Sequence, residues 1–189
     1  MSIIIGIVGE NGGGKDSLSK AIATCRPDLV VETFKSSDIL RDTLKMWGIE
    51  TTREHLQQLP VLMDRTFGEG VLSRAVHARM QASMAHVIIF NGVRWATDVS
   101  VVRSFERNML VYITAEPELR FGRLTARFEK PGEHGMNYTQ FQQEEQALTE
   151  RMIPEIGKTA DYTIHNNGSM DSFMGDVKKF CDTFLQDIK

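Results

Sequence analysis

The chain has 189 residues, of which 41% are hydrophobic and 25% charged, and its formal net charge is −3. This length is typical of one domain with a sizeable core, and the small net charge excludes a bulk attraction to nucleic acid or to a membrane surface. The net charge does not exclude a cleft that is locally basic. The two distant cysteines, Cys25 and Cys181, indicate free thiols in a reducing compartment. Because no leader-like segment and no membrane-length apolar run is present, we expect a cytoplasmic protein without membrane contact.

Strands and helices alternate along the chain. Apolar runs predict strands at residues 3–8, 29–34, 86–90, 109–114 and 162–165. Helical patterns and cap signals predict helices at 15–24, 37–47, from 51 or 52 onward, 70–85, 97–107, 117–128, 139–151 and 170–185. The alternation predicts a three-layer α/β fold, in which a five-stranded parallel sheet carries helices on both faces. Ligands of such sheets bind beyond the carboxyl ends of the strands.

The first strand runs directly into a Gly-rich segment, GENGGGKDS, which extends from Gly9 to Ser17. A buried strand, a Gly-rich turn, a lysine and a helix in this order fit the phosphate-binding pattern G-x-x-x-x-G-K, and an ordinary βα turn is the lesser alternative. The glycines let backbone N–H groups point at phosphate oxygens, while the helix N-terminus and the lysine add positive charge. We therefore predict ATP binding by Gly9, Asn11, Gly12, Gly13, Gly14, Lys15, Asp16 and Ser17.

The residue after Lys15 departs from this pattern. It is usually a Ser or Thr whose hydroxyl holds magnesium, but here it is Asp16, with Ser17 next. A carboxylate can ligate Mg²⁺, although it also repels phosphate. We expect Mg²⁺ as the cofactor and ATP as the phosphoryl donor, with Asp16 or Ser17 facing the metal.

Several arginines lie just after strands or on the helix that follows the fourth strand. Arg41 and Arg94 follow the second and third strands, and Arg123 and Arg127 share one helix face because they are four residues apart. Phosphoryl transfer needs fixed cations around a polyanion, and the planar guanidinium binds phosphate oxygens in pairs. These arginines are therefore candidate phosphate ligands.

The motifs resemble those of the nucleotide-kinase branch of the P-loop proteins: adenylate-kinase-like, dephospho-CoA-kinase-like and bacteriophage deoxynucleoside monophosphate kinases. The resemblance covers nearly the whole chain. Its motifs are GENGGGKDS, SSDILRDTL (36–44), IIFNGVRWATDV (88–99), ELRFGRLTARFEKPGE (118–133) and IPEIGKTADYTIHNNGSMDSF (153–173). It implies one P-loop kinase domain over residues 1–189, with an acceptor-binding insertion at 37–85 and a small lid at 128–138.

The resemblance also implies roles for individual residues. Acceptor binding falls to Ser37, Asp38, Arg41 and Arg94, and donor binding includes Arg123, Asn167 and Gly168. The implied catalytic residues are Lys15, Arg94, Arg123 and Arg127.

One position departs from these families. The carboxylate that they carry at the end of the third strand, where it orients magnesium through water, is Asn91 here. The hypothesis is that Asp16 supplies the missing negative charge, with Asn91 acting on the metal through water. Reduced or absent catalysis is the alternative.

Other side chains keep two interpretations. Arg120 and Arg151 can be interpreted as phosphate ligands or as members of surface ion pairs. Glu144 and Glu145 hold a substrate hydroxyl or a lid arginine, or they lie on an exposed acidic face, which the pattern favours.

The roles of three aromatic residues and one histidine also have two interpretations. Core packing is the default for Trp47, Phe67 and Trp95, and stacking on a base is the alternative. His134 of the lid is expected to be solvated rather than to touch a phosphate.

Three functions compete. The first is ATP-dependent phosphorylation of a nucleoside monophosphate, with a deoxynucleotide preferred because of the resemblance. The second is a kinase for a hydroxyl, on dephospho-CoA or on a modified base in DNA. The third is a non-catalytic nucleotide-binding switch. The expected partners are ATP and a nucleotide-like small molecule, whereas nucleic acid and a homodimer are left open.

Overall fold

The computed structural model describes residues 2–127 and 136–188. Its strands are β1 (Ile3–Val8), β2 (Val31–Phe34), β3 (Val87–Val93), β4 (Asn108–Thr114) and β5 (Tyr162–His165). They form one sheet in the order β2-β3-β1-β4-β5, and every neighbouring pair is parallel. The predicted five-stranded parallel sheet is therefore confirmed.

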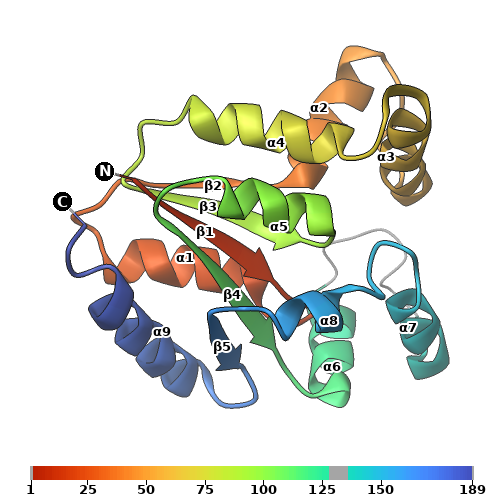
Figure 1. Ribbon diagram of the computed structural model, residues 1–189. Coiled ribbons are helices and arrows are strands. Elements are labelled where there is room, and N and C mark those ends of the chain that lie inside the picture. Colours follow the sequence, from red (N-terminus) through yellow and green to blue (C-terminus); the bar gives the residue numbers. More distant parts are fainter. Residues whose placement is uncertain (1, 128–135, 189) are drawn as a thin grey trace.

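Helices cover both faces of this sheet (Figure 1). Their bounds are α1 (Lys15–Cys25), α2 (Ser36–Met46), α3 (Arg53–Phe67), α4 (Val71–Gln81), α5 (Ala96–Arg103), α6 (Pro117–Arg127), α7 (Tyr138–Glu145), α8 (Ile153–Gly157) and α9 (Met170–Phe184). One buried cluster joins the sheet to α1 and α9, and the other joins it to α4, α5 and α8. The chain thus has the three layers that the alternating pattern predicts.

The central strand β1 explains why its sequence is apolar without alternation. Ile5 and Ile7 belong to the cluster under α1 and α9, whereas Ile4 and Val8 belong to the cluster under α4 and α5. A strand covered on both faces buries every side chain, so all six residues of β1 are buried.

The end of β3 differs from the prediction. The strand continues to Val93, beyond the predicted end at Phe90, so Asn91 and Gly92 lie within it. Ile7 pairs with Asn91 and Val8 pairs with Val93, which leaves Gly92 as an extra residue with a φ of 101°. Glycine adopts this conformation at little cost, and the resulting bulge sets the direction of the chain just before Arg94.

Several helix limits also differ. The helices expected at 70–85 and 97–107 end at Gln81 and Arg103, and the helix expected at 139–151 ends at Glu145. The short α8 was not predicted from the sequence. It forms because Ile153 and Ile156 are buried on the sheet, a tertiary contact that a local pattern does not reveal.

The expected packing of two aromatic residues is wrong. Trp47 and Phe67 are 53% and 64% exposed, so neither lies in a core, whereas Trp95 is half-buried. The reason is that α2 and α3 project beyond the sheet and pack against α4 (Figure 1). Within the described part of the chain, no helix combines the length and apolar character needed to cross a membrane.

Candidate active site

The Gly-rich loop wraps tightly at the carboxyl end of β1. Gly12 and Gly14 have φ values of 79° and 110°, which L side chains rarely adopt. A Cβ on Gly12 would lie 2.6 Å from the carbonyl oxygen of Arg120, and a Cβ on Gly14 would lie 2.5 Å from Nδ2 of Asn166. Both glycines are therefore required by conformation and by the close approach of neighbouring segments.

Lys15 is the first residue of α1 and folds back over the loop. Its Nζ donates to the carbonyl oxygens of Gly9 at 2.6 Å and Glu10 at 2.9 Å. The N-cap residue Gly14 makes no side-chain cap, so the helix begins without a side chain covering its first N–H groups. Uncapped N–H groups and an ammonium at one loop are the arrangement that binds phosphate.

Arg123 and Asn166 tie the loop to two other segments. Nη2 of Arg123 donates to the carbonyl oxygen of Asn166 at 2.8 Å, and its Nη1 lies 3.5 Å from the carbonyl oxygen of Gly12. Asn166, which follows β5, donates through Nδ2 to the carbonyl oxygen of Gly13 at 3.0 Å. The loop, α6 and the turn after β5 therefore meet at one place.

Arg120 lies beneath this place and is not a solvated residue, since it is only 5% exposed. Its Nε donates to the carbonyl oxygen of Ala115 at 2.9 Å, and its Nη1 pairs with Glu145 and lies 3.4 Å from the carbonyl oxygen of Asn11. Its guanidinium also lies 5.4 Å from the ring centre of Phe141. Arg120 thus joins the loop to α7, and Glu145 holds an arginine rather than lying on an exposed acidic face.

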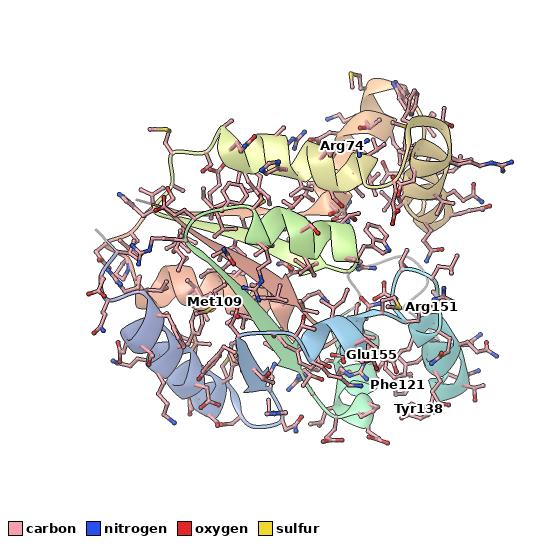
Figure 2. All side chains as sticks on the ribbon, viewed as in Figure 1. Arg74, Met109, Phe121, Tyr138, Arg151 and Glu155 are labelled. Carbon is pink, nitrogen blue, oxygen red and sulfur yellow. The ribbon has the colours of Figure 1, made fainter. Side chains whose placement is uncertain are left out.

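A small aromatic cluster holds α6 and α7 together around that arginine. Phe121 and Tyr138 meet edge to face with ring centres 5.3 Å apart (Figure 2). Leu124, Met136 and Phe141 complete the cluster, which is separate from the two sheet cores. The helices on either side of residues 128–135 therefore have a core of their own.

Asp16 lies between two donors from different strands. Its Oδ1 accepts from Nζ of Lys35, at the end of β2, and from Nδ2 of Asn91 on β3, both at 2.7 Å. Asn91 also donates to Oγ of Ser19 at 3.2 Å. Burial by itself would raise the pKa of Asp16, but the hydrogen bond and charge of Lys35, with the hydrogen bond of Asn91, hold that pKa below its ordinary value.

Arg94 is held by carboxylates from two elements. Its guanidinium pairs with Glu150 in the segment before α8, and Oδ2 of the buried Asp98 accepts from its backbone N–H at 2.9 Å. Asp98 Oδ1 accepts from Oγ of Ser73 at 2.6 Å. Burial raises the pKa of Asp98, against the opposing effect of these hydrogen bonds. Asp98 therefore fixes the strand-to-helix turn that carries Arg94.

Arg41 makes its contacts within its own helix. Its Nη1 donates to Oγ of Ser37 at 3.1 Å and to Oδ1 of Asp38 at 2.9 Å, and the pair is about half exposed. Lys35 is the N-cap of α2, and it makes no side-chain cap. Ser37, Asp38 and Arg41 thus lie on the first two turns of α2, whereas Arg94 follows β3. Among the described residues, Arg41 pairs with Asp38 and Arg94 pairs with Glu150.

Glu10 of the loop turns toward the sheet. Its Oε1 accepts from the hydroxyl of Tyr112 on β4, and its buried Oε2 has no hydrogen-bond partner within the described residues. Burial and the neighbouring carboxylate raise the pKa of Tyr112 to about 12. Glu10 is therefore linked to the core side of the loop through Tyr112.

The remaining predicted positions have different surroundings. Asn167 accepts the backbone N–H of Glu116 through Oδ1 at 2.8 Å, and Gly168 precedes α9. Arg151 is exposed in the segment that leads to α8 (Figure 2). Residues 128–135 of the predicted lid, with His134, lie outside the described residues, and so does the side chain of Arg127.

Sequence reasoning missed several residues of this site. Lys35 directly follows a predicted strand, a signal that could have found it, and Asn166 is adjacent to the predicted Asn167 and Gly168. Glu150 has no comparable signal, because only the path of the chain after α7 brings it to Arg94.

Asp16, Ser17 and Asn91 carry oxygen atoms of the kinds that bind magnesium, and Oδ1 of Asp16 accepts from Lys35 and Asn91 in this structure. Carboxylate, hydroxyl and amide oxygens are suitable ligands, and Mg²⁺ commonly uses one or two carboxylates with substrate phosphates and water. Within the described residues, no group of three or more His, Cys, Asp or Glu side chains could hold a metal ion by itself. Asp16 and Ser17 would be the protein ligands, and Asn91 would act through water.

Comparison with known proteins finds distant relatives of similar length. No protein-family model matches it. It is 25% identical over 177 residues to a UPF0200 protein of Hyperthermus butylicus, covering 94% of this chain and 92% of that one. It is 24% identical over 193 residues to a UPF0200 protein of Thermococcus kodakarensis, covering 97% and 98%.

Solved structures of shikimate kinases are similar in architecture. The enzyme from Bacteroides thetaiotaomicron has a TM-score of 0.63 and 17% identity, covering 97% of this chain and 98% of that one. The enzyme from Acinetobacter baumannii, in complex with shikimate, has a TM-score of 0.57 and 15% identity, covering 98% and 92%. At these identities the likeness shows the fold alone. The chain has a P-loop kinase-like fold, and its assignment to particular nucleotide-kinase families stays a prediction.

Proposed function

We propose that this protein is an ATP-dependent phosphotransferase that phosphorylates a small molecule, with a nucleoside monophosphate, specifically a deoxynucleotide, as the first candidate acceptor. The observation that carries the proposal is the meeting of three segments at the Gly-rich loop. Lys15 covers the loop, and Asn166 donates to the loop carbonyl of Gly13 from the turn after β5. Arg123 of α6 donates to the carbonyl of Asn166 and approaches that of Gly12. Such convergence on a phosphate-binding loop supports a donor site for ATP.

Each residue has a defined task in this proposal. The uncapped N–H groups of α1 and Lys15 bind the donor phosphates and stabilise the charge that develops on the transferred group. Arg123, with Arg127 as the second predicted arginine, binds the same phosphates and helps to exclude water that would hydrolyse ATP. Magnesium, when bound at Asp16 and Ser17, neutralises phosphate charge, and Asn91 holds Asp16 in position by hydrogen bonding.

The acceptor proposal rests on Arg41 and Arg94. Arg41 lies on α2, the helix after β2, and Arg94 directly follows β3, the strand that pairs with β2. Each already faces a carboxylate, Asp38 and Glu150 respectively, so an acceptor phosphate would replace an internal anion at each guanidinium. Two arginines held in this way are suited to a doubly charged acceptor.

Phosphorylation of a hydroxyl is the second candidate. Its support is the architectural likeness to shikimate kinases, one of them in complex with shikimate, and the presence of carboxylates beside both arginines. Asp38 would then act on the hydroxyl proton.

One assay separates the candidates. All ribo- and deoxynucleoside monophosphates, dephospho-CoA and shikimate are offered with Mg·ATP, and product ADP is measured for the parent protein and for Lys15→Ala. We expect acceptor-dependent ADP formation with one or a few monophosphates and none with the variant. Turnover only with dephospho-CoA or shikimate would favour the second candidate. Tight ATP binding without turnover on any acceptor would favour the nucleotide-binding switch.

A further inference from the structure

Lys35 is a charged residue of the site to which the proposed phosphoryl transfer assigns no role. It stands between β2 and α2, and its ammonium lies 2.7 Å from Oδ1 of Asp16 in the first turn of α1. The pair therefore connects the helix that begins at the phosphate loop with the helix that carries Ser37 and Arg41.

The surroundings of this ion pair make it exchangeable. The side chains of Lys35 and Asp16 are 34% and 54% exposed, so water reaches both. Exposed pairs are weak, and the four-carbon stem of lysine lets its ammonium leave without a change in the backbone. Asp16, in contrast, stays in place through the hydrogen bond from the buried Asn91.

The position of Asp16 creates a difficulty for nucleotide binding. Its carboxylate follows Lys15 directly, so an incoming polyphosphate meets a negative charge at the helix start where phosphate loops usually carry a hydroxyl. A neighbouring cation is needed to offset that repulsion whenever no metal is bound. Lys35 is in the place to do so.

We propose that Lys35 is a built-in counter-cation of the nucleotide site: its ammonium neutralises Asp16 while no metal is bound, and it yields that carboxylate when Mg·ATP occupies the loop. This inference rests on the proposed function. It makes Lys35 a positioning residue, because it acts on nucleotide and metal affinity through Asp16. It also links metal binding to α2, since Lys35 is the N-cap residue of that helix.

The proposal predicts effects of opposite sign for the two partners. Without Lys35, the uncompensated carboxylate weakens ATP binding in the absence of metal, but Mg²⁺ no longer competes with an ammonium for Asp16. Without the charge of Asp16, metal-free ATP binding is unchanged or tighter, and the need for Mg²⁺ rises. A residue with a merely structural role would not produce this reversal.

The experiment compares Lys35→Met and Asp16→Asn with the parent, with Lys35→Arg to restore the charge and Lys20→Met as a control. Lys20 is an exposed lysine of α1, so its removal changes the net charge equally. ATP affinity is measured by titration calorimetry in EDTA and in saturating Mg²⁺, together with the Mg²⁺ concentration that gives half of the full ATP affinity. Thermal melting checks that each variant is folded.

We expect Lys35→Met to weaken metal-free ATP binding by about two- to fivefold and to lower the Mg²⁺ requirement by a similar factor, the size expected for a partly exposed charge pair. Asp16→Asn should raise the Mg²⁺ requirement by about tenfold or more, while Lys35→Arg and Lys20→Met stay near the parent. Equal metal-free affinities for Lys35→Met and Lys20→Met would overturn the inference and leave the proposed function intact. A folded parent that binds no ATP in either buffer would overturn the proposed function as well.

Discussion

Replacement of Arg120 by alanine tests whether the buried Arg120–Glu145 ion pair holds the phosphate loop in place. The change removes the partner of Glu145, the hydrogen bonds to the carbonyl oxygens of Ala115 and Asn11, and the contact with the ring of Phe141. The loss of one partner from a buried pair costs about 3–5 kcal/mol, because the other charge is left without compensation. Since Glu145 is partly exposed, we expect the lower limit, about 3 kcal/mol.

Arg103 offers a matched control on the surface. Its Nη1 and Nη2 donate to Oδ2 and Oδ1 of Asp161 at 2.7 and 3.0 Å, but both side chains are more than one-third exposed. Solvent screens such a pair, so Arg103→Ala should cost no more than about 1 kcal/mol.

Urea denaturation of both variants measures the two losses of unfolding free energy. For a chain of this size, a loss of about 3 kcal/mol lowers the melting temperature by about 6–12 °C. A double-mutant cycle with Glu145→Gln should show that most of the Arg120 effect depends on Glu145. If Arg120→Ala cost no more than Arg103→Ala, the buried arginine would not hold the loop, and the reasoning from burial would be refuted.

Variants at the phosphate loop, at the acceptor arginines and at the two cysteines test other parts of the structure. Lys15→Ala should lower turnover by at least about 100-fold at an unchanged melting temperature, and near-parent turnover in a folded variant would contradict its catalytic role. Arg41→Ala and Arg94→Ala should raise the acceptor KM by about 10- to 100-fold, because each loses charge-assisted hydrogen bonds, and the ATP KM much less; equal rises would contradict separate sites. Burial raises the pKa of Cys181 to about 12, so its thiol keeps the proton at pH 8 and at pH 10. A thiol reagent should then label Cys25 in the native protein and Cys181 only after unfolding, and rapid labelling of native Cys25→Ser would contradict this.

The architecture and the phosphate loop could be predicted because their signals are local. An apolar run without alternation marks a strand covered on both faces, as β1 is. A Gly-rich segment between such a strand and a helix has few conformations, and Gly12, Gly14 and Lys15 each have a separate physical reason to be there. The order of these elements also predicts which end of the sheet carries the site.

The ion pairs of the site were decided by tertiary structure. Lys35 meets Asp16, Arg94 meets Glu150 and Arg120 meets Glu145 only because the sheet order and the chain path after α7 bring distant segments together. An arginine on a helix has the same local sequence whether a carboxylate buries it or water surrounds it, so the choice between phosphate ligand, surface pair and structural pair cannot be made from the chain alone. The sequence by itself therefore determined which backbone segment binds phosphate. The folded structure decided which charged side chains pair around that segment, because charge pairing depends on distances that no local pattern encodes.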